Sequence, residues 1–130
     1  MTTPASTRRE YEVRARSTDT FGRVLCSARE NHFVVDGPVQ NGCPGEALTP
    51  PEAFLAAVAA CGVELVQVIA REQGVPLSRA GVHIHGVVDR AQQPRADLTV
   101  FTSARLHFEL SGDGLDRARA AQLIDDFRRR

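Results

Sequence analysis

One stretch, residues 49–73, restricts the fold of this chain more than any other. Between residues 53 and 70 nearly every side chain is apolar or small, and only Glu64 and Gln67 are polar. A helix that is apolar on every side is typically a buried one. The sequence therefore predicts a buried central helix that carries the thiol of Cys61 near its middle.

Both ends of this helix are marked by the residues around them. Thr49 can cap the N-terminus, Pro50 suits the first helical position, and Glu52 stands at the capping-box spacing from Thr49. Gly74 followed by Pro76 ends the helix, because proline cannot continue it. These capped ends favour a water-soluble helix.

A membrane span is the alternative that this hydropathy raises. The apolar run is at the short end for crossing a bilayer, it contains Glu64, and it is rich in alanine rather than leucine. We therefore expect no membrane partner.

The rest of the chain carries strand and turn signals, with one amphipathic helix at residues 115–130. Apolar and polar residues alternate, or β-forming residues gather, in five segments that predict strands: 11–16, 21–27, 32–36, 81–89 and 98–110. The predicted order is three strands, the buried helix, two strands and a helix. This is an α+β fold in which an antiparallel sheet packs on the helices.

Composition limits the classes of function. A length of 130 residues suits one domain, here residues 11–130 after a polar tail at 1–10. Lys+Arg and Asp+Glu both total 16, so no net charge favours nucleic acid. Three cysteines and a polar N-terminus without a signal peptide indicate a reducing cytoplasm. No nucleotide-binding or nucleophile-elbow motif is present, so no cofactor is expected.

Two histidines raise the question of a metal. His83 and His85 alternate on a predicted strand and share a face, and His107 can lie beside them across the sheet. No further ligand is apparent in the sequence. We expect surface histidines and no metal site.

The segment Pro50-Pro51-Glu52-Ala53-Phe54-Leu55-Ala56-Ala57-Val58-Ala59-Ala60-Cys61 resembles the OsmC/Ohr family. Members carry a proline and one or two acidic residues before an Ala/Gly-rich helix that ends in Ala-Cys or Gly-Cys. Residues 36–46 resemble the family's approach loop, and residues 101–112 resemble its long strand before the last helix. The resemblance implies an OsmC-like fold, intertwined homodimers with the active site at the subunit interface, and thiol-dependent reduction of peroxides.

The family's chemistry uses two cysteines, and Cys61 matches the nucleophilic one. The resolving cysteine of relatives falls about where residue 131 would be, so the chain lacks it and the family's last strand. This indicates either a truncated form or the loss of half the usual machinery. Cys26 and Cys43 are both expected to be inert, with Cys43, in a Gly/Pro loop close to the start of the helix, as the alternative resolving thiol.

A peroxide is attacked by a thiolate, so the pKa of Cys61 has to be lowered. Cys61 lies more than two turns into the helix, where the helix dipole has little effect, so a cation is required. Relatives place an arginine in the N-terminal hairpin, which implies Arg16 or Arg23 without separating them. Glu52 can orient that arginine by a bidentate pair, although its capping role explains it equally well and it stands one residue later than the peroxidase branch places its acid.

The sequence leaves two functions open. The first is a thiol-dependent redox protein that reduces organic hydroperoxides or related oxidants through Cys61, with a small thiol as reductant. The second is a non-catalytic dimer that binds a small molecule or lipid, with Cys61 as a buried structural residue. The rate at which Cys61 reacts with peroxide discriminates between the two functions. A redox site requires a fast reaction, whereas a binding protein gives a slow one.

Overall fold

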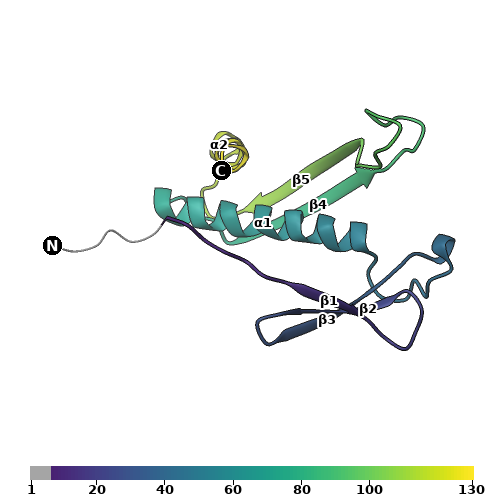
Figure 1. Ribbon diagram of the computed structural model, residues 1–130. Coiled ribbons are helices and arrows are strands. Elements are labelled where there is room, and N and C mark those ends of the chain that lie inside the picture. Colours follow the sequence, from purple (N-terminus) through teal and green to yellow (C-terminus); the bar gives the residue numbers. More distant parts are fainter. Residues whose placement is uncertain (1–6) are drawn as a thin grey trace. The chain divides into compact units, whose positions relative to one another are not determined.

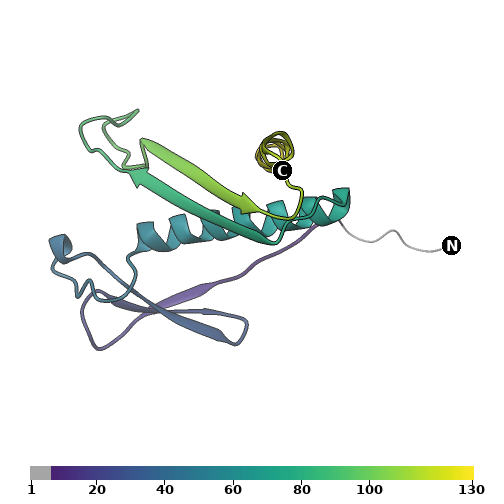
Figure 2. The ribbon, with the colours of Figure 1, turned by 180° about the vertical axis from the view of Figure 1, so that it is seen from behind.

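A computed structural model describes residues 7–130 (Figures 1 and 2). Most of the tail predicted at residues 1–10 lies outside the described residues. The helices and strands are β1 (Arg14–Ser17), β2 (Arg23–Ala28), β3 (Asn31–Asp36), the short 3-10 helix η1 (Val39–Asn41), α1 (Pro50–Gln73), β4 (Arg79–Val87), β5 (Ser103–Ser111) and α2 (Arg117–Arg128). This α+β order is the predicted one. The chain divides into two compact units, one ending at Ala53 and the other beginning at Phe54.

The first unit contains an antiparallel sheet in which β2 lies between β1 and β3 (Figure 1). Ala28 pairs with Asn31, so only two residues connect β2 to β3. The first of them, Arg29, adopts the left-handed conformation that such a tight turn uses. A turn of fixed length fixes the register of the strands it joins. As a result, Arg23 at the start of β2 lies directly opposite Asp36 at the end of β3.

In the second unit, β4 and β5 form an antiparallel hairpin that runs alongside α1 in both ribbon views (Figures 1 and 2). Along β5, half-buried Leu106, Phe108 and Leu110 alternate with exposed polar residues, as the period-two pattern predicts. Helix α1 approaches the apolar face closely at Gly62. A Cβ atom on Gly62 would lie 3.3 Å from the ring of Phe108, which is tighter than an ordinary contact, so a larger residue would require that ring to shift.

The core of the second unit lies where α2 meets the C-terminal half of α1. Ile69, Ala70 and Leu123 are fully buried there, and four partly buried side chains pack around them: Val75, Leu77, Leu110 and Phe127. Helix α2 begins after Asp116, whose side chain accepts a hydrogen bond of 2.8 Å from the backbone N–H of Arg119. The predicted amphipathic stripe thus places Leu123 at the centre of this core.

The strand predicted at residues 98–110 is shorter than the alternation suggested, and β5 begins only at Ser103. The side-chain amide of Gln93 explains the difference. It accepts a hydrogen bond of 2.7 Å from the N–H of Val100 and donates one of 3.1 Å to the Val100 carbonyl. Because these backbone groups are already paired within the loop, Val100 does not enter the β4–β5 ladder. Phe101 instead stacks on Phe54, with ring centroids 5.8 Å apart.

Helix α1 keeps much of its apolar surface accessible. Among its described residues, four are buried: Gly62, Val66, Ile69 and Ala70. Phe54 remains 58% exposed, and Ala56, Ala57 and Ala60 are also exposed. By length and composition alone, α1 is long and apolar enough to cross a membrane. Core helices of water-soluble proteins often meet the same two criteria. Of the most apolar stretch of α1, 22% is buried. Within the second unit, the β4–β5 hairpin and α2 therefore cover only part of the predicted buried helix.

We expect Leu123→Ala to lower the free energy of unfolding by about 2–5 kcal/mol, because it leaves a cavity among fully buried side chains. Urea denaturation followed by circular dichroism measures this loss. The matched control is Leu48→Ala, since Leu48 is 54% exposed and its truncation should cost roughly 0.5 kcal/mol or less. Equal losses in the two variants would contradict this assignment of the core.

Candidate functional site

Cys61 lies near the middle of α1, and its side chain is exposed. The residues one turn away on the helix surface are apolar on the N-terminal side, Ala57 and Val58. On the C-terminal side the residue three positions later is Glu64, the one charged residue between 53 and 70. Helix α1 thus presents an accessible thiol but supplies no cation to activate it.

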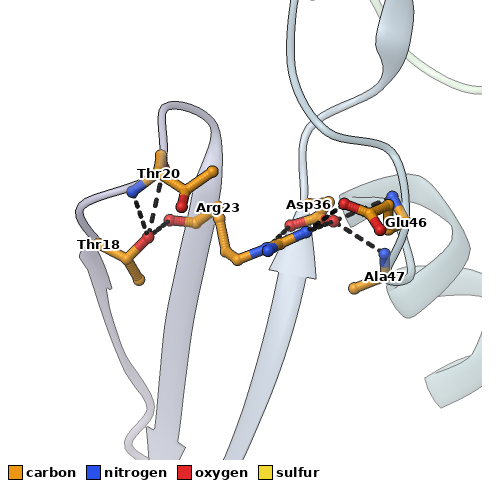
Figure 3. Close-up of polar contacts among 6 residues, drawn as sticks. All are labelled: Thr18, Thr20, Arg23, Asp36, Glu46 and Ala47. Atoms are coloured by element: carbon orange, nitrogen blue, oxygen red, sulfur yellow. Dashed lines mark hydrogen bonds and ion pairs between the residues drawn. The ribbon is translucent and has the colours of Figure 1, made fainter.

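Arg23 is the centre of a cluster of charges in the first unit (Figure 3). Its Nε donates to Oδ1 of Asp36 over 2.9 Å, and its Nη2 donates to Oδ2 of Asp36 over 3.0 Å. The same Nη2 donates to Oε1 of Glu46 over 3.1 Å. These hydrogen bonds, first of all the pair with Asp36, raise the pKa of Arg23 above its ordinary value. The guanidinium is therefore held in one orientation by two carboxylates.

Asp36 is the buried charge of this cluster, with no exposed surface. Besides Arg23, its Oδ2 accepts hydrogen bonds from the backbone N–H groups of Glu46, at 3.0 Å, and Ala47, at 2.8 Å. The Arg23 guanidinium, followed by the Ala47 and Glu46 N–H groups, holds the pKa of Asp36 well below its usual range. A buried carboxylate with this many donors stays ionised and stays in place.

The turn before β2 positions the backbone of Arg23 (Figure 3). The hydroxyl of Thr18 donates to the Arg23 carbonyl over 3.0 Å and accepts from the N–H of Thr20 over 3.2 Å. Gly22 completes the turn with φ at +79°, and a Cβ there would lie 2.4 Å from the sulfur of Cys43. The loop that follows β3 therefore packs directly on this turn, which brings Glu46 to Arg23.

The family model described as OsmC-like protein matches residues 43–130 of this chain. The chain belongs to the OsmC family. Solved structures agree at the level of the fold. The OsmC-like protein of Mycoplasma pneumoniae has a TM-score of 0.78 and 16% identity over 94% of this chain and 82% of its own.

Two further OsmC-type structures carry more specific names. An organic hydroperoxide resistance protein OsmC from Legionella pneumophila has a TM-score of 0.74 and 17% identity over 95% of this chain and 85% of its own. An organic hydroperoxide resistance protein from Elizabethkingia anophelis has a TM-score of 0.75 and 14% identity over 96% and 85%. No curated protein matches the chain. At these identities the solved structures show the OsmC fold alone, which does not by itself assign a function.

Two other residues that the sequence predicted for the site of this OsmC chain, Glu52 and Arg16, do not pair with each other or with Arg23 within residues 7–130. Glu52 accepts hydrogen bonds from the hydroxyl of Thr49, at 2.7 Å, and from its N–H, at 3.0 Å, and the pKa of Glu52 is lowered by them. It is a helix cap, and among residues 7–130 it pairs with no arginine. Arg16 is exposed in β1 and forms no ion pair within the same described range. Of the two predicted arginines, Arg23 is the one that the structure joins to carboxylates, and they are Asp36 and Glu46 rather than Glu52.

The two remaining cysteines of this OsmC chain differ from Cys61 in access. Cys26 is 9% exposed in the middle of β2. The side chain of Cys43 is partly buried and packs against the backbone of Gly22 and Gly37. The structure thus places both of these thiols within the first unit, and the most accessible one is Cys61.

The three histidines considered for a metal lie on the exposed face of the β4–β5 hairpin. His83 pairs directly with His107, as the sequence suggested, while His85 pairs with Arg105. Within the described part of the chain, no three side chains of histidine, cysteine, aspartate or glutamate converge in a way that could hold a metal ion. The hairpin therefore carries a histidine pair without a third ligand.

Sequence reasoning missed Asp36 and Glu46 as members of the site. One signal was available for Asp36, because it is a charged residue at the end of the apolar run Phe33-Val34-Val35. A two-residue turn after Ala28 would have set the register that pairs it with Arg23. No local pattern marks Glu46, which reaches Arg23 only through the path of the loop.

We expect Asp36 to make the folded chain sensitive to acid. Its pKa is lower in the folded chain than the ordinary unfolded value of about 3.9, so its contribution to stability is present above about pH 4 and is lost as the pH falls below that. Melting temperatures from pH 7 to pH 3 should show Asp36→Asn less stable than the native chain at pH 7, with the difference shrinking as the pH drops. A difference that does not change with pH would contradict this.

Proposed function

We propose that this OsmC-family chain is a thiol-dependent redox protein that reduces organic hydroperoxides or related oxidants through Cys61. The observation that carries the proposal is the exposed thiol of Cys61 on the Ala-rich helix α1 of an OsmC chain. The solved structures named as organic hydroperoxide resistance proteins support the same chemistry. An exposed thiol is a better nucleophile for an external oxidant than Cys26, which is 9% exposed.

The proposed reaction begins with attack of the Cys61 thiolate on the terminal peroxide oxygen. A sulfur–oxygen bond forms, the oxygen–oxygen bond breaks, and the alkoxide leaves and takes a proton to become an alcohol. Cys61 is oxidised by two electrons to the sulfenic acid, and the peroxide is reduced. A small thiol then attacks the sulfenic acid, releasing water and forming a mixed disulfide, and a second thiol restores Cys61. We place this cycle in the cytoplasm, where such thiols are abundant.

The chemistry needs a cation that favours the thiolate, and we propose Arg23 for this role. Asp36 orients its guanidinium, and 31% of the Arg23 side chain is still exposed, so in this proposal the guanidinium can bind an anion. Arg16 is the second choice, because it is exposed and lacks an orienting partner among residues 7–130. In this proposal Glu52 contributes by capping α1 at Thr49.

We expect Cys61 to be the most peroxide-sensitive of the three thiols. Mass spectrometry after substoichiometric cumene hydroperoxide should place the first oxidation on Cys61, because Cys26 and Cys43 are shielded. Cys61→Ser should reduce thiol-dependent peroxide consumption to the uncatalysed rate, a loss of roughly a hundredfold or more. Cys26→Ser is the matched control and should retain the activity. If Cys26 or Cys43 is oxidised first, the proposal is wrong. If Cys61 reacts only slowly with the peroxide, the result favours the binding alternative.

We also propose that the protein is a homodimer in which part of α1 is covered by a second copy. The support comes from the accessible apolar surface of α1, including Phe54 and exposed alanines. A contiguous apolar surface of this kind is uncommon on monomers and is typical of an interface. A symmetric pair of copies is the commonest way to cover such a surface.

Light scattering at micromolar concentration should therefore give twice the 14.2 kDa mass of the chain. Ala60→Glu should shift the protein toward the monomer, because it places a charge on the exposed apolar face of α1. Ala121→Glu on α2, also at an exposed position, is the control and should leave the mass unchanged. A native chain that runs as a monomer would rule the dimer out.

A further inference from the structure

We propose that His83 and His107 form a two-histidine site for a divalent transition-metal ion on the exposed face of the β4–β5 hairpin. The ion belongs to the class that binds imidazole, which includes Ni²⁺, Zn²⁺ and Cu²⁺. Because no third ligand converges on the pair within the described part of the chain, water completes the coordination. The inference is independent of the function proposed for Cys61, since every residue that carries it lies in β4 or β5.

The strand register places the two imidazoles side by side. His83 in β4 is directly opposite His107 in β5, within a ladder that pairs residues 79–87 with residues 103–111 (Figure 1). Directly opposite residues have Cβ atoms about 4.5–5.5 Å apart, and their side chains leave the sheet on the same face. A tetrahedral ion with metal–nitrogen bonds of about 2.0–2.1 Å holds two ligand nitrogens roughly 3.3 Å apart. The spacing of this pair suits that requirement.

Both imidazoles are accessible on a backbone that is already fixed. His83 and His107 are exposed, and the His107 side chain is 72% exposed. The adjacent pair in the ladder, Ile84 and Leu106, points to the other face and is half-buried. Burial on that face holds the two strands together without any ion. Metal binding therefore has to order side-chain torsions alone, which lowers its entropic cost.

A carboxylate beside the pair supports binding of a cation. Oε1 of Glu109 lies 3.9 Å from Nε2 of His107. Glu109 is directly opposite Gly81, and a Cβ atom on Gly81 would meet no atom within 4 Å, so the carboxylate has room to turn toward the imidazole. A carboxylate that accepts the other ring N–H of a ligating histidine fixes the ring and makes it a stronger ligand. Glu109 can take this part for His107.

The third histidine of this face, His85, is less suited to bind a cation. It is directly opposite Arg105, whose guanidinium keeps its positive charge. Placed beside His85, a metal ion would be repelled by that charge. For His107 the balance differs, because Arg105 and Glu109 flank it along β5 with opposite charges. The hairpin thus favours one histidine pair over the other combinations.

The test titrates the full chain with Ni²⁺ at pH 7.5 and measures binding by calorimetry. Ni²⁺ binds imidazole and, unlike Cu²⁺, does not oxidise the thiols. The native chain should bind one ion at micromolar concentrations. His83→Gln and His107→Gln should each remove this binding, and Glu109→Gln should weaken it by up to about tenfold. All variants keep the three cysteines, so any Ni²⁺ held by thiols is equal throughout.

Two matched controls remove the other histidines. His85→Gln should leave the binding unchanged, because His85 is opposite Arg105. His32→Gln should also leave it unchanged, because His32 lies in β3 and its Nδ1 is 2.9 Å from the hydroxyl of Ser27. Histidine binds a metal in its neutral form, so the affinity of the native chain should fall when the titration is repeated at pH 5.5.

Melting temperature gives a second readout. Ni²⁺ should raise the melting temperature of the native chain, because it joins two strands that are paired only in the folded state. His83→Gln should lose this rise. The inference is wrong if His83→Gln binds Ni²⁺ as tightly as the native chain, if His85→Gln loses the binding as fully as His107→Gln, or if the native chain binds Ni²⁺ only at millimolar concentrations.

Discussion

Helix α1 has more apolar surface than the hairpin beside it can cover. The β4–β5 hairpin takes one face, where Gly62 allows Phe108 to approach, and α2 covers the C-terminal half through Leu123. Small residues dominate the remainder, so that face is smooth and suited to close approach by another apolar surface. The same helix carries Cys61, so this thiol belongs to the element whose burial drives folding of the second unit.

The first unit depends on a different interaction, the burial of a charge. Asp36 is the one fully buried charged side chain among residues 7–130, and it accepts hydrogen bonds from the side chain of Arg23 in β2 and from two backbone N–H groups in the loop after β3. A buried carboxylate is costly unless it is fully paired, so the strand register, the Gly22 turn and the loop carrying Glu46 are coupled through it. The pairing makes Arg23 a rigid cation rather than a mobile surface side chain.

These two constraints suit the proposed chemistry in complementary ways. A helix without lysine or arginine between residues 53 and 70 can bury its surface, but it offers no cation to a thiolate. A cluster built on a buried aspartate can hold an arginine in a fixed orientation without large apolar side chains. The proposed nucleophile and the proposed cation lie on different elements, so each element can satisfy its own packing requirement.

The sequence by itself determined the elements whose signals are local. The bounds of α1, the Thr49–Glu52 cap, the alternation along β5 and the stripe of α2 all follow from side chains a few residues apart, and the motif around Cys61 led to the family. Tertiary structure alone decided which groups meet across longer separations. Asp36 contacts Arg23 because of the strand register, and Glu46 contacts it because of the path of the loop after β3. Gln93 forms hydrogen bonds with the backbone of Val100, so β5 begins only at Ser103. The physical reason is that periodicity and capping depend on side chains only a few residues apart in the sequence. The pairing of polar groups that are distant in sequence depends instead on the tertiary path of the backbone.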